Sequence, residues 1–285
     1  MIRRPVTGIF NAVLVRVELK EGHILYLNDT NQYAEIGTTT HEGKCGLDID
    51  KASDFIIYAE KGKETRTEIS YRIELSETGQ ARIRKHLEYF GNEFTSNNMK
   101  FAEMTPEMRK RYHQGLVSAI SQSAKPESGL VSKFDSYPGS EDFSVTIDKY
   151  AVRDGNLLYL MLPESLNGIL PVASGKRVNP FFYPGNIDVG KEFTIVFPEK
   201  YYSECSILPA GICIDIPYGE NSKIETSSSN SIGNGSFAKD RTFTIKQQIY
   251  LKPFIYTNLQ YEDFLLKINE RITNPRMRSI LIETK

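Results

Sequence analysis

The sequence contains no tryptophan and only three cysteines. Cys45, Cys205 and Cys213 are an odd number in a long chain, which does not indicate a disulfide framework. Cys205 and Cys213 would pair if a hairpin brought them together, although free cysteines more often pack as small buried hydrophobic side chains. Both arrangements stay open for this pair.

Histidine is scarce as well, with four residues in the whole chain. His23, His41, His86 and His113 show no spacing typical of metal ligands, and no CxxC pair accompanies them. The nucleotide-binding and zinc-protease signatures GxxxxGK[ST], GxGxxG and HExxH do not occur. The sequence therefore predicts neither a metal nor a cofactor.

Charge of one sign is not in excess, because 35 Lys and Arg balance 36 Asp and Glu. No basic run interleaved with aromatics occurs, so the composition argues against nucleic acid as a partner. Long hydrophobic runs are also lacking. Met1 to Pro5 holds two arginines with no apolar stretch behind them, and no later segment has the length of a membrane span. The sequence as written predicts no signal peptide and no membrane span.

What the sequence has in abundance is short β-prone runs. Several of them alternate between apolar and polar residues, as half-buried strands do, whereas 156–162 is continuously apolar and typical of a buried strand. These runs cover 13–17, 24–27, 67–89, 143–147, 156–162, 193–197, 212–216, 243–251 and 280–282. The run at 67–89 turns at Ser76 to Gly79 and predicts a long antiparallel hairpin. We interpret its charged face as a solvated surface rather than a binding patch. That face carries Arg66, Glu68, Arg72, Glu74, Arg82 and Arg84.

Two helices are predicted among these strands. Thr105 is a suitable N-cap with Pro106 at the first helical position, and apolar residues recur at helical spacing from Met108 to Ile120 before Lys125–Pro126 stops the run. A shorter helix is predicted at 261–272. The Ser-, Asn- and Gly-rich stretch 227–236 predicts a hairpin loop. The expected fold class is mainly β with a few helices, arranged as antiparallel β-sandwich modules.

Phe10 to Val15 and Tyr26 to Tyr33 form a more specific pattern. The first stretch reads Phe-Asn-Ala-Val-Leu-Val, and the second reads Tyr-Leu-Asn-Asp-Thr-Asn-Gln-Tyr. Together they resemble the closing two strands of a transglutaminase-like, papain-type domain. In that family an Asn-His pair on one strand and an Asp-x-Thr on the next complete a Cys-His-Asp triad.

The resemblance implies that the catalytic positions are degenerate. Ala12 occupies the place of the histidine, and an alanine methyl cannot take a proton from a thiol. With Thr30 aligned to the family threonine, Asn28 stands at the aspartate and Asp29 lies one place beyond it. The family nucleophile would lie before Phe10, so all three cysteines fall on the wrong side. A local site from His41, Cys45 and Asp48 or Asp50 is a poor alternative, because neighbours in sequence rarely converge in space.

Three further stretches carry the same resemblance. They are 67–88 with the helix beginning at Thr105, 177–180 leading to 193–201, and 241–250 with the helix at 261–272 and the end 280–282. The whole is similar to the C-terminal half of a bacterial multi-domain family, in which β-sandwich modules of unknown function follow the transglutaminase-like core. It implies an accessory region whose parent proteins are directed to the periplasm or cell envelope. The missing export signal would then lie upstream.

The chain is therefore expected to have three parts, of which the second and third meet at an approximate boundary near Pro163 to Gly175. They are the last strands of a transglutaminase-like core at 1–50, a β-rich domain with one helix at 51–165, and a C-terminal β-sandwich domain at 166–285.

Three functional hypotheses follow. In the first, the chain is a non-catalytic accessory region of a truncated or degenerate transglutaminase-like protein, with a structural or binding role. In the second, an upstream core or another chain supplies the cysteine of a protease or acyltransferase. In the third, the chain is a carbohydrate- or peptide-binding sandwich, because amphipathic rings in turns are common at binding surfaces. The candidate rings are Phe182, Tyr183, Tyr201 and Tyr202. The alternative is that these rings cap the core.

Overall fold

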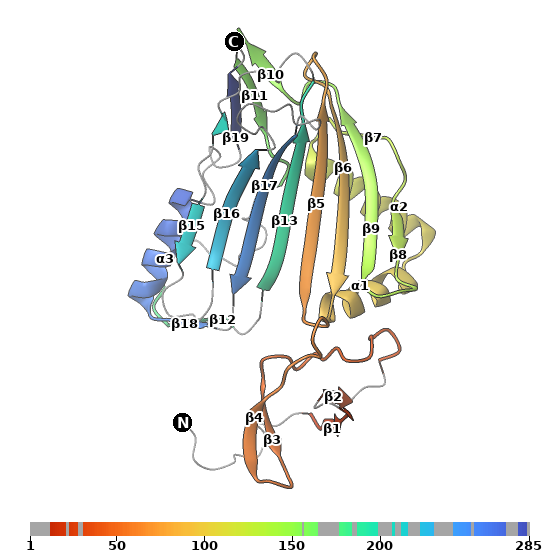
Figure 1. Cartoon of the computed structure of the whole chain (residues 1–285), viewed down its shortest axis with the longest axis vertical. Helices are drawn as coiled ribbons and strands as arrows, with labels where there is room; N and C mark the ends of the chain where they lie inside the picture. The colour runs from red at the N-terminus through yellow and green to blue at the C-terminus, as the bar shows by residue number, and fades with distance from the viewer. Residues whose placement is uncertain are drawn as a thin grey trace. The chain divides into compact units, whose positions relative to one another are not determined.

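The fold is taken from a computed structural model of the chain (Figure 1). It describes residues 12–20, 23–27, 31–155, 157–164, 177–183, 187–198, 207–208, 212–215, 223–230, 242–251, 254–271 and 279–283. The described residues form many strands and three helices, which confirms a mainly β fold with few helices. The chain divides into two compact units. Unit one is Met1–Arg66, Tyr89–Glu103 and Phe134–Gly139, and unit two is Thr67–Glu88, Met104–Lys133 and Ser140–Lys285.

A nine-stranded sheet dominates the structure. Its strands follow the order β15-β16-β17-β13-β5-β6-β9-β7, and β8 pairs with β9 off this path. Their bounds are β5 (Arg66–Leu75), β6 (Ala81–Phe90), β7 (Lys125–Pro126), β8 (Val131–Lys133), β9 (Gly139–Ile147), β13 (Ile187–Val196), β15 (Ile212–Asp215), β16 (Lys223–Asn230) and β17 (Thr242–Leu251).

The pair at the middle of this sheet is parallel. Strand β13 runs alongside β5, with Val189 opposite Thr67 and Val196 opposite Glu74, whereas β13 and β17 are antiparallel. A parallel pair needs a long crossover connection, so its partners lie far apart in the sequence. The expectation of purely antiparallel modules did not anticipate this pairing. Strands from both sides of the predicted boundary near Pro163 to Gly175 thus share one sheet, and the structure divides the chain differently from the sequence-based scheme.

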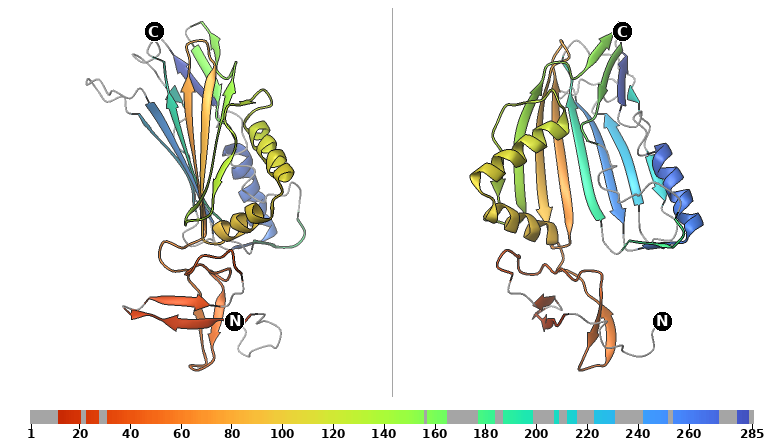
Figure 2. Two further views of the ribbon diagram at one scale, coloured as in Figure 1. Left: turned by 90° about the vertical axis from the view of Figure 1, so that its right-hand side faces the viewer. Right: turned by 180° about the vertical axis from the view of Figure 1, so that it is seen from behind.

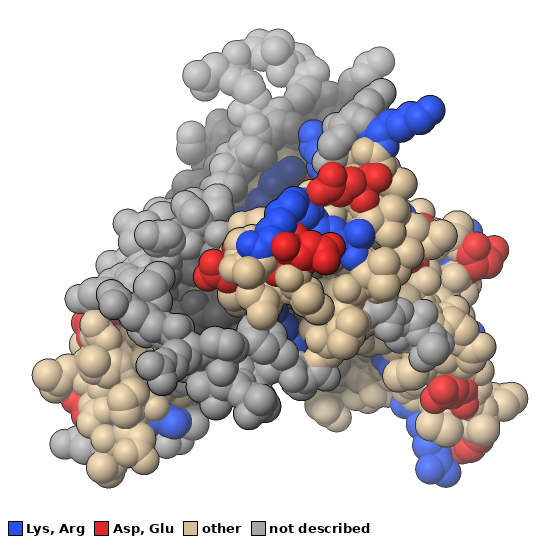
Figure 3. All heavy atoms as spheres, turned by 90° about the horizontal axis from the view of Figure 1, so that it is seen from below, with Lys and Arg blue, Asp and Glu red and all other residues tan. Residues whose placement is uncertain are grey.

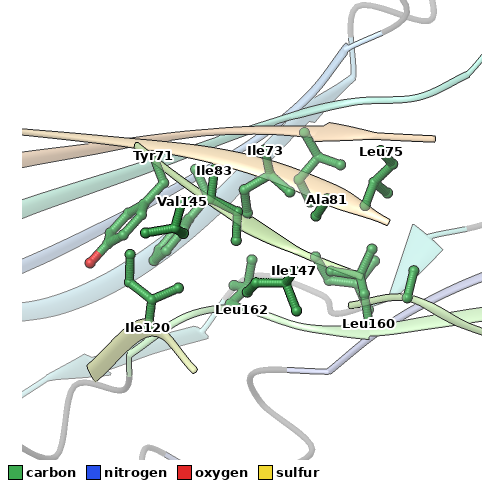
Figure 4. Close-up of a cluster of buried hydrophobic side chains, with 14 of the residues drawn as sticks. Tyr71, Ile73, Leu75, Ala81, Ile83, Ile120, Val145, Ile147, Leu160 and Leu162 are labelled. Atoms are coloured by element: carbon green, nitrogen blue, oxygen red, sulfur yellow. The ribbon is translucent and has the colours of Figure 1, made fainter. Parts of the chain in front are cut away.

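One face of the large sheet carries the hydrophobic core (Figure 4). Helix α2 (Pro106–Ile120) and a second sheet of order β10-β11-β19-β14 contribute to the same buried cluster. The strands of this sheet are β10 (Val152–Asp154), β11 (Leu157–Met161), β14 (Ile207–Leu208) and β19 (Ser279–Glu283). Figure 2 shows α2 and α3 (Asn258–Arg271) on the same side of the large sheet. A small sheet pairs β12 (Phe181–Tyr183) with β18 (Phe254–Tyr256).

Alternation along the strands decides which side chains enter this core. On β5, Tyr71, Ile73 and Leu75 are buried, while Ser70 before them and Arg72 between the first two are exposed. Successive residues of a strand point to opposite faces, so every second residue is available to the other face. The long hairpin predicted at 67–89 is confirmed as β5 and β6.

Helix α2 begins as its sequence predicts. The Thr105 hydroxyl accepts a hydrogen bond from the Met108 amide at 3.3 Å, and Pro106 stands at the first helical position. The helix ends at Ile120, which is the last residue of the predicted apolar stripe. The sequence reading missed the helix before it, α1 (Asn92–Glu103). The loop predicted from residue 227 is also partly wrong, because β16 continues to Asn230.

Unit one contains two separate hairpins and α1. The hairpins are β1 (Val15–Glu18) with β2 (Ile24–Leu27), and β3 (Cys45–Asp48) with β4 (Ser53–Ile56). The first confirms a predicted hairpin, whereas the second was missed. Side chains of α1 hold the loops near these hairpins: Asn92 donates to the Thr39 carbonyl and Asn98 donates to the Tyr33 carbonyl, each at 3.0 Å.

Gly91 allows a close approach within unit one. It has φ +56, and a Cβ placed on it would lie 2.6 Å from the backbone nitrogen of Thr65. The neighbouring Asn92 amide donates to the Thr65 hydroxyl at 3.2 Å, which fixes the two segments together. A side chain at residue 91 would thus meet both an unfavourable φ and a backbone that cannot move aside.

We predict that Gly91→Ala destabilises the protein more than Gly155→Ala. Gly155 has φ +59 but open space around its Cβ position, so alanine there pays only the left-handed cost of about 1 to 2 kcal/mol. Gly91→Ala adds an overpacking cost of about 1 to 3 kcal/mol. Urea unfolding of the two variants measures the difference. Equal losses of free energy of unfolding would contradict the close approach.

Candidate functional site

The degenerate catalytic positions do not form a site among the described residues. Ala12 is exposed and precedes β1, and Asn28 and Asp29 lie outside the described residues. Cys45 is an exposed free cysteine on β3. Asp48 accepts hydrogen bonds from the Asp50 and Lys51 amides, both at 3.0 Å, so its carboxylate is engaged in the turn after β3.

The structure describes only some of the candidate aromatic residues. Phe182 and Tyr183 belong to β12, where they lie opposite Ile255 and Phe254, but their side chains are outside the described residues. Tyr201 and Tyr202 are wholly outside, as is Cys205. Cys213 lies on β15 opposite Glu225, so the pairing of the two cysteines stays a prediction.

The two hairpins of unit one expose an unusual share of apolar side chains. Each hairpin pairs only with itself in the described residues. The exposed fraction reaches 81% for Val13 and 83% for Ile49. Other exposed apolar residues of this region are Val15, Leu19, Leu27, Ile36, Leu47, Ile56 and Tyr58. We call this set the hairpin surface.

The hairpins bury part of their surface against each other. The rings of Tyr26 on β2 and Phe55 on β4 stack with centroids 6.0 Å apart. The Phe55 ring also covers Gly46 on the neighbouring strand, where a Cβ would lie 2.6 Å from the ring. A lone two-stranded hairpin is at best marginally stable in water. The exposed apolar side chains therefore mark a surface suited to a further contact.

Unit two carries a cavity of about 710 Å³ on the sheet face opposite the core. We call it the sheet groove. Residues at alternating positions of four neighbouring strands line it, at the place where the parallel pair β5 and β13 meets β6 and β17. The outward-facing lining residues are Glu68, Ser70, His86, Glu88, Asp188, Gly190, Glu192, Lys246, Gln248 and Tyr250.

The strand register arranges these residues in rows across the sheet. Glu68 lies opposite Gly190, and Gly190 lies opposite Gln248. In the next row Glu192 lies opposite Lys246, and their side chains form an ion pair of 3.0 Å. Cross-strand neighbours of this kind are close enough for their side chains to interact. The groove is thus a continuous polar surface over four strands.

His86 lies at one margin of the groove and is oriented by Asp142 of β9. Its Nδ1 lies 2.9 Å from a carboxylate oxygen of Asp142, and Arg84 donates to the same carboxylate at 2.9 Å. Burial would raise the pKa of Asp142, but the hydrogen bonds from Arg84 and His86 outweigh it and lower the pKa below its ordinary value. A stable negative charge at Asp142 therefore fixes the ring.

Directly behind the groove, on the core side of the same strands, lies a buried ionic cluster. Lys85 and Lys191 are 4% exposed each, and both contact the carboxylate of Glu164. The Lys191 Nζ lies 3.3 Å from Glu164, which adopts φ +58. The Tyr71 hydroxyl lies nearby, and its pKa is raised well above the ordinary value by burial and by the Glu164 carboxylate.

The charge of Glu164 depends on these two lysines. Its burial would raise the pKa of the carboxyl, but the Lys85 and Lys191 ammonium groups and the Lys85 hydrogen bond lower it to about 2. An uncompensated charge at a buried site is costly, so both lysines need this carboxylate. The cluster connects the end of β11 with β6 and β13.

No family model, curated protein or solved structure matches the chain. No group of His, Cys, Asp and Glu in the described residues is suited to hold a metal ion. Within the same residues, no helix is both long and apolar enough to cross a membrane. Figure 3 shows Lys and Arg side chains interspersed with Asp and Glu among the described residues of the face in view.

We predict that Glu164→Gln lowers the free energy of unfolding by about 3 to 5 kcal/mol at neutral pH, because it leaves two buried ammonium groups without a counter-charge. The folded pKa of about 2 lies below the ordinary 4.5, so the stabilisation is present above about pH 4.5 and is lost as the pH falls towards 2. Denaturant unfolding of both proteins from pH 7 to pH 2 measures this convergence.

Glu107→Gln is the matched control for that variant. Glu107 forms an exposed i,i+4 pair with Arg111, which is worth at most about 0.5 kcal/mol. A Glu164→Gln variant as stable as the Glu107→Gln control at neutral pH would show that the buried cluster does not stabilise the fold.

Proposed function

We propose that the chain is a non-catalytic accessory region that docks on a papain-type, transglutaminase-like core through the hairpin surface. The observation that carries the proposal is the exposure of apolar side chains on two hairpins that pair only with themselves in the described residues. Covering these side chains removes apolar area from water, which is the main driving force for stable association. The large sheet of unit two has its own core and serves as the scaffold.

The resemblance of residues 10–33 to the closing strands of such a core supports this choice of partner. In a papain-type domain these strands pack against the remainder of the domain, and their apolar side chains are then buried. Ala12 supports a non-catalytic role, because a site without an imidazole cannot activate a thiol through a general base. The structural role of the strands does not require the lost histidine.

We predict that the purified chain has no thiol-dependent activity. Turnover of a glutamine-donor peptide with an amine acceptor is expected to equal that of buffer. Cys45→Ser is expected to change nothing, since Cys45 is an exposed free cysteine and the resemblance places the family nucleophile before Phe10. Ammonia release measures this. Turnover that disappears with Cys45→Ser would refute the non-catalytic role.

Docking is tested with the papain-type segment encoded directly upstream of the chain, expressed separately. We expect it to bind the chain, and we expect the triple variant Val15→Thr, Leu27→Thr, Ile49→Thr to weaken binding at least about tenfold, because three exposed apolar contacts are lost. Stability should change little, since all three side chains are already exposed. Isothermal titration calorimetry and urea unfolding report the two effects.

The control variant Val131→Thr, Val152→Thr, Leu259→Thr removes exposed apolar groups from unit two instead. It should bind the upstream segment as tightly as the unchanged chain. Equal weakening by both triple variants, or an upstream reading frame without a papain-type segment, would overturn the proposal. Turnover by the reconstituted complex would instead favour the hypothesis of an enzyme whose cysteine lies upstream.

A further inference from the structure

The connection between β2 and β3 is long, and its described residues, 31–44, form neither helix nor strand. Connections longer than about 12 residues without secondary structure are uncommon in compact units and are usually functional or disordered. This connection is held in one shape. The Thr38 hydroxyl donates to the Glu35 carbonyl at 2.7 Å, and side-chain amides of α1 donate to the carbonyls of Tyr33 and Thr39. A fixed loop of this length favours a binding role.

Two hollows open beside this loop, and Tyr26 of β2 lines both of them. The first has a volume of about 150 Å³ and is lined by Tyr26, the loop and the first turn of α1. The second has a volume of about 220 Å³, and its lining includes Tyr26, His23, Tyr58, Glu60 and Lys61. Both hollows belong to unit one. We call the pair the Tyr26 hollows.

Gly37 and Glu60 connect the two hollows. Gly37 lines the first and Glu60 lines the second. The Glu60 amide donates to the Gly37 carbonyl at 3.0 Å. A Cβ on Gly37 would overlap the Glu60 carboxylate, and its φ of +90 also favours glycine. The Glu60 carboxylate therefore lies at the boundary between the hollows, where it can accept hydrogen bonds from a ligand that occupies both.

Aromatic rings supply the apolar part of the lining. The Tyr26 ring stacks on Phe55 with centroids 6.0 Å apart, which fixes its orientation. Tyr58 is 67% exposed, so its ring is available to a ligand in the second hollow. Covering such a ring removes apolar area from water while its hydroxyl stays accessible.

The polar part of the lining has hydroxyl and amide groups and no excess of either charge. Thr38 to Thr40 and Asn92 line the first hollow, and such groups both donate and accept hydrogen bonds. Glu35 of the same hollow pairs with Lys63 at 2.8 Å. In the second hollow Lys61 accompanies Glu60. A site for phosphate or for a metal cation would instead concentrate one sign of charge.

We propose that the Tyr26 hollows bind a short neutral oligosaccharide, with one sugar ring against Tyr58 in the second hollow and the adjoining sugar at the threonine and asparagine groups of the first. A pyranose ring has C–H faces that pack on aromatic rings and a rim of hydroxyls that donate and accept hydrogen bonds. Each hollow is smaller than the usual range for drug-sized ligands, so each suits a single sugar ring.

This site differs from the aromatic site suggested by the sequence, whose four rings lie at 182–183 and 201–202. It overlaps the hairpin surface, because Leu27, Ile36 and Tyr58 line the hollows as well. A bound sugar and a docked core would therefore use some of the same residues. The proposal does not rest on docking, so its test uses the full chain without the upstream segment, and its failure would leave the docking proposal standing.

The test uses three neutral tetrasaccharides, cellotetraose, chitotetraose and maltotetraose, with a Gly-Ser tetrapeptide as comparison. Isothermal titration calorimetry should show at least one sugar binding with a Kd of about 1 mM or tighter. Tyr58→Ala should weaken this binding at least about fivefold, because the stacking face is lost. Thr40→Val should weaken it about threefold, because one hydroxyl of the first hollow is replaced by a methyl of similar size.

The matched control is Tyr159→Ala, which removes an exposed ring of unit two outside both hollows. It should bind the sugar as the unchanged chain does. Failure of all three sugars to bind, or equal weakening by the control, would refute the site. Binding of the tetrapeptide as tight as that of the sugar would overturn the assignment of the ligand. Urea unfolding of Tyr58→Ala and Thr40→Val should match the unchanged chain, since both side chains are exposed, and a loss of stability in both would show that they serve folding instead.

Discussion

The parallel pairing of β5 with β13 is the interaction on which the rest of unit two depends. It joins strands contributed by distant parts of the chain into one sheet. Without it, two sets of strands would each present an unpaired edge, which invites association with other chains. The same pair places Tyr71 against Phe193, with ring centroids 4.8 Å apart in a stacked arrangement. The junction of β5 with β13 thus provides both strand hydrogen bonds and packing in the core.

This junction has a different chemistry on each face. Towards the core lie stacked rings and an ionic cluster that is stable because one carboxylate serves two ammonium groups. Towards solvent lie polar and charged side chains, among them the ion pair of Glu192 with Lys246. Burial makes the first arrangement costly to disturb, whereas solvent screening weakens the second.

Local patterns predicted much of the fold. The β5 and β6 hairpin follows from alternation, and the start of α2 follows from Thr105 and Pro106. Helix α1 was missed because its polar run from Asn92 to Asn98 lacks an apolar stripe of clear helical spacing. The parallel pair was missed because its contacts join residues more than a hundred positions apart, and no local signal encodes such a pairing.

The candidate site was harder to foresee for a related reason. The aromatic residues stood out in the sequence because they are large and clustered. The groove instead gathers common polar residues, such as Glu68 and Gln248, from strands that only the folded topology brings together. A glycine within a strand, Gly190, was the one local sign of a close approach. Which side chain approaches Gly190 depends on the residue opposite it on the neighbouring strand, and the sequence alone does not identify that residue as Glu68.

Strand β13 contributes Gly190 and Glu192 to the groove and Lys191, Phe193 and Ile195 to the core. These five positions are therefore under two sets of requirements that alternate residue by residue. Substitutions can be absorbed one at a time, but an insertion or deletion of a single residue would exchange the two faces from that point onward. Over evolutionary time such a strand can accept amino-acid substitutions far more readily than a change in its length.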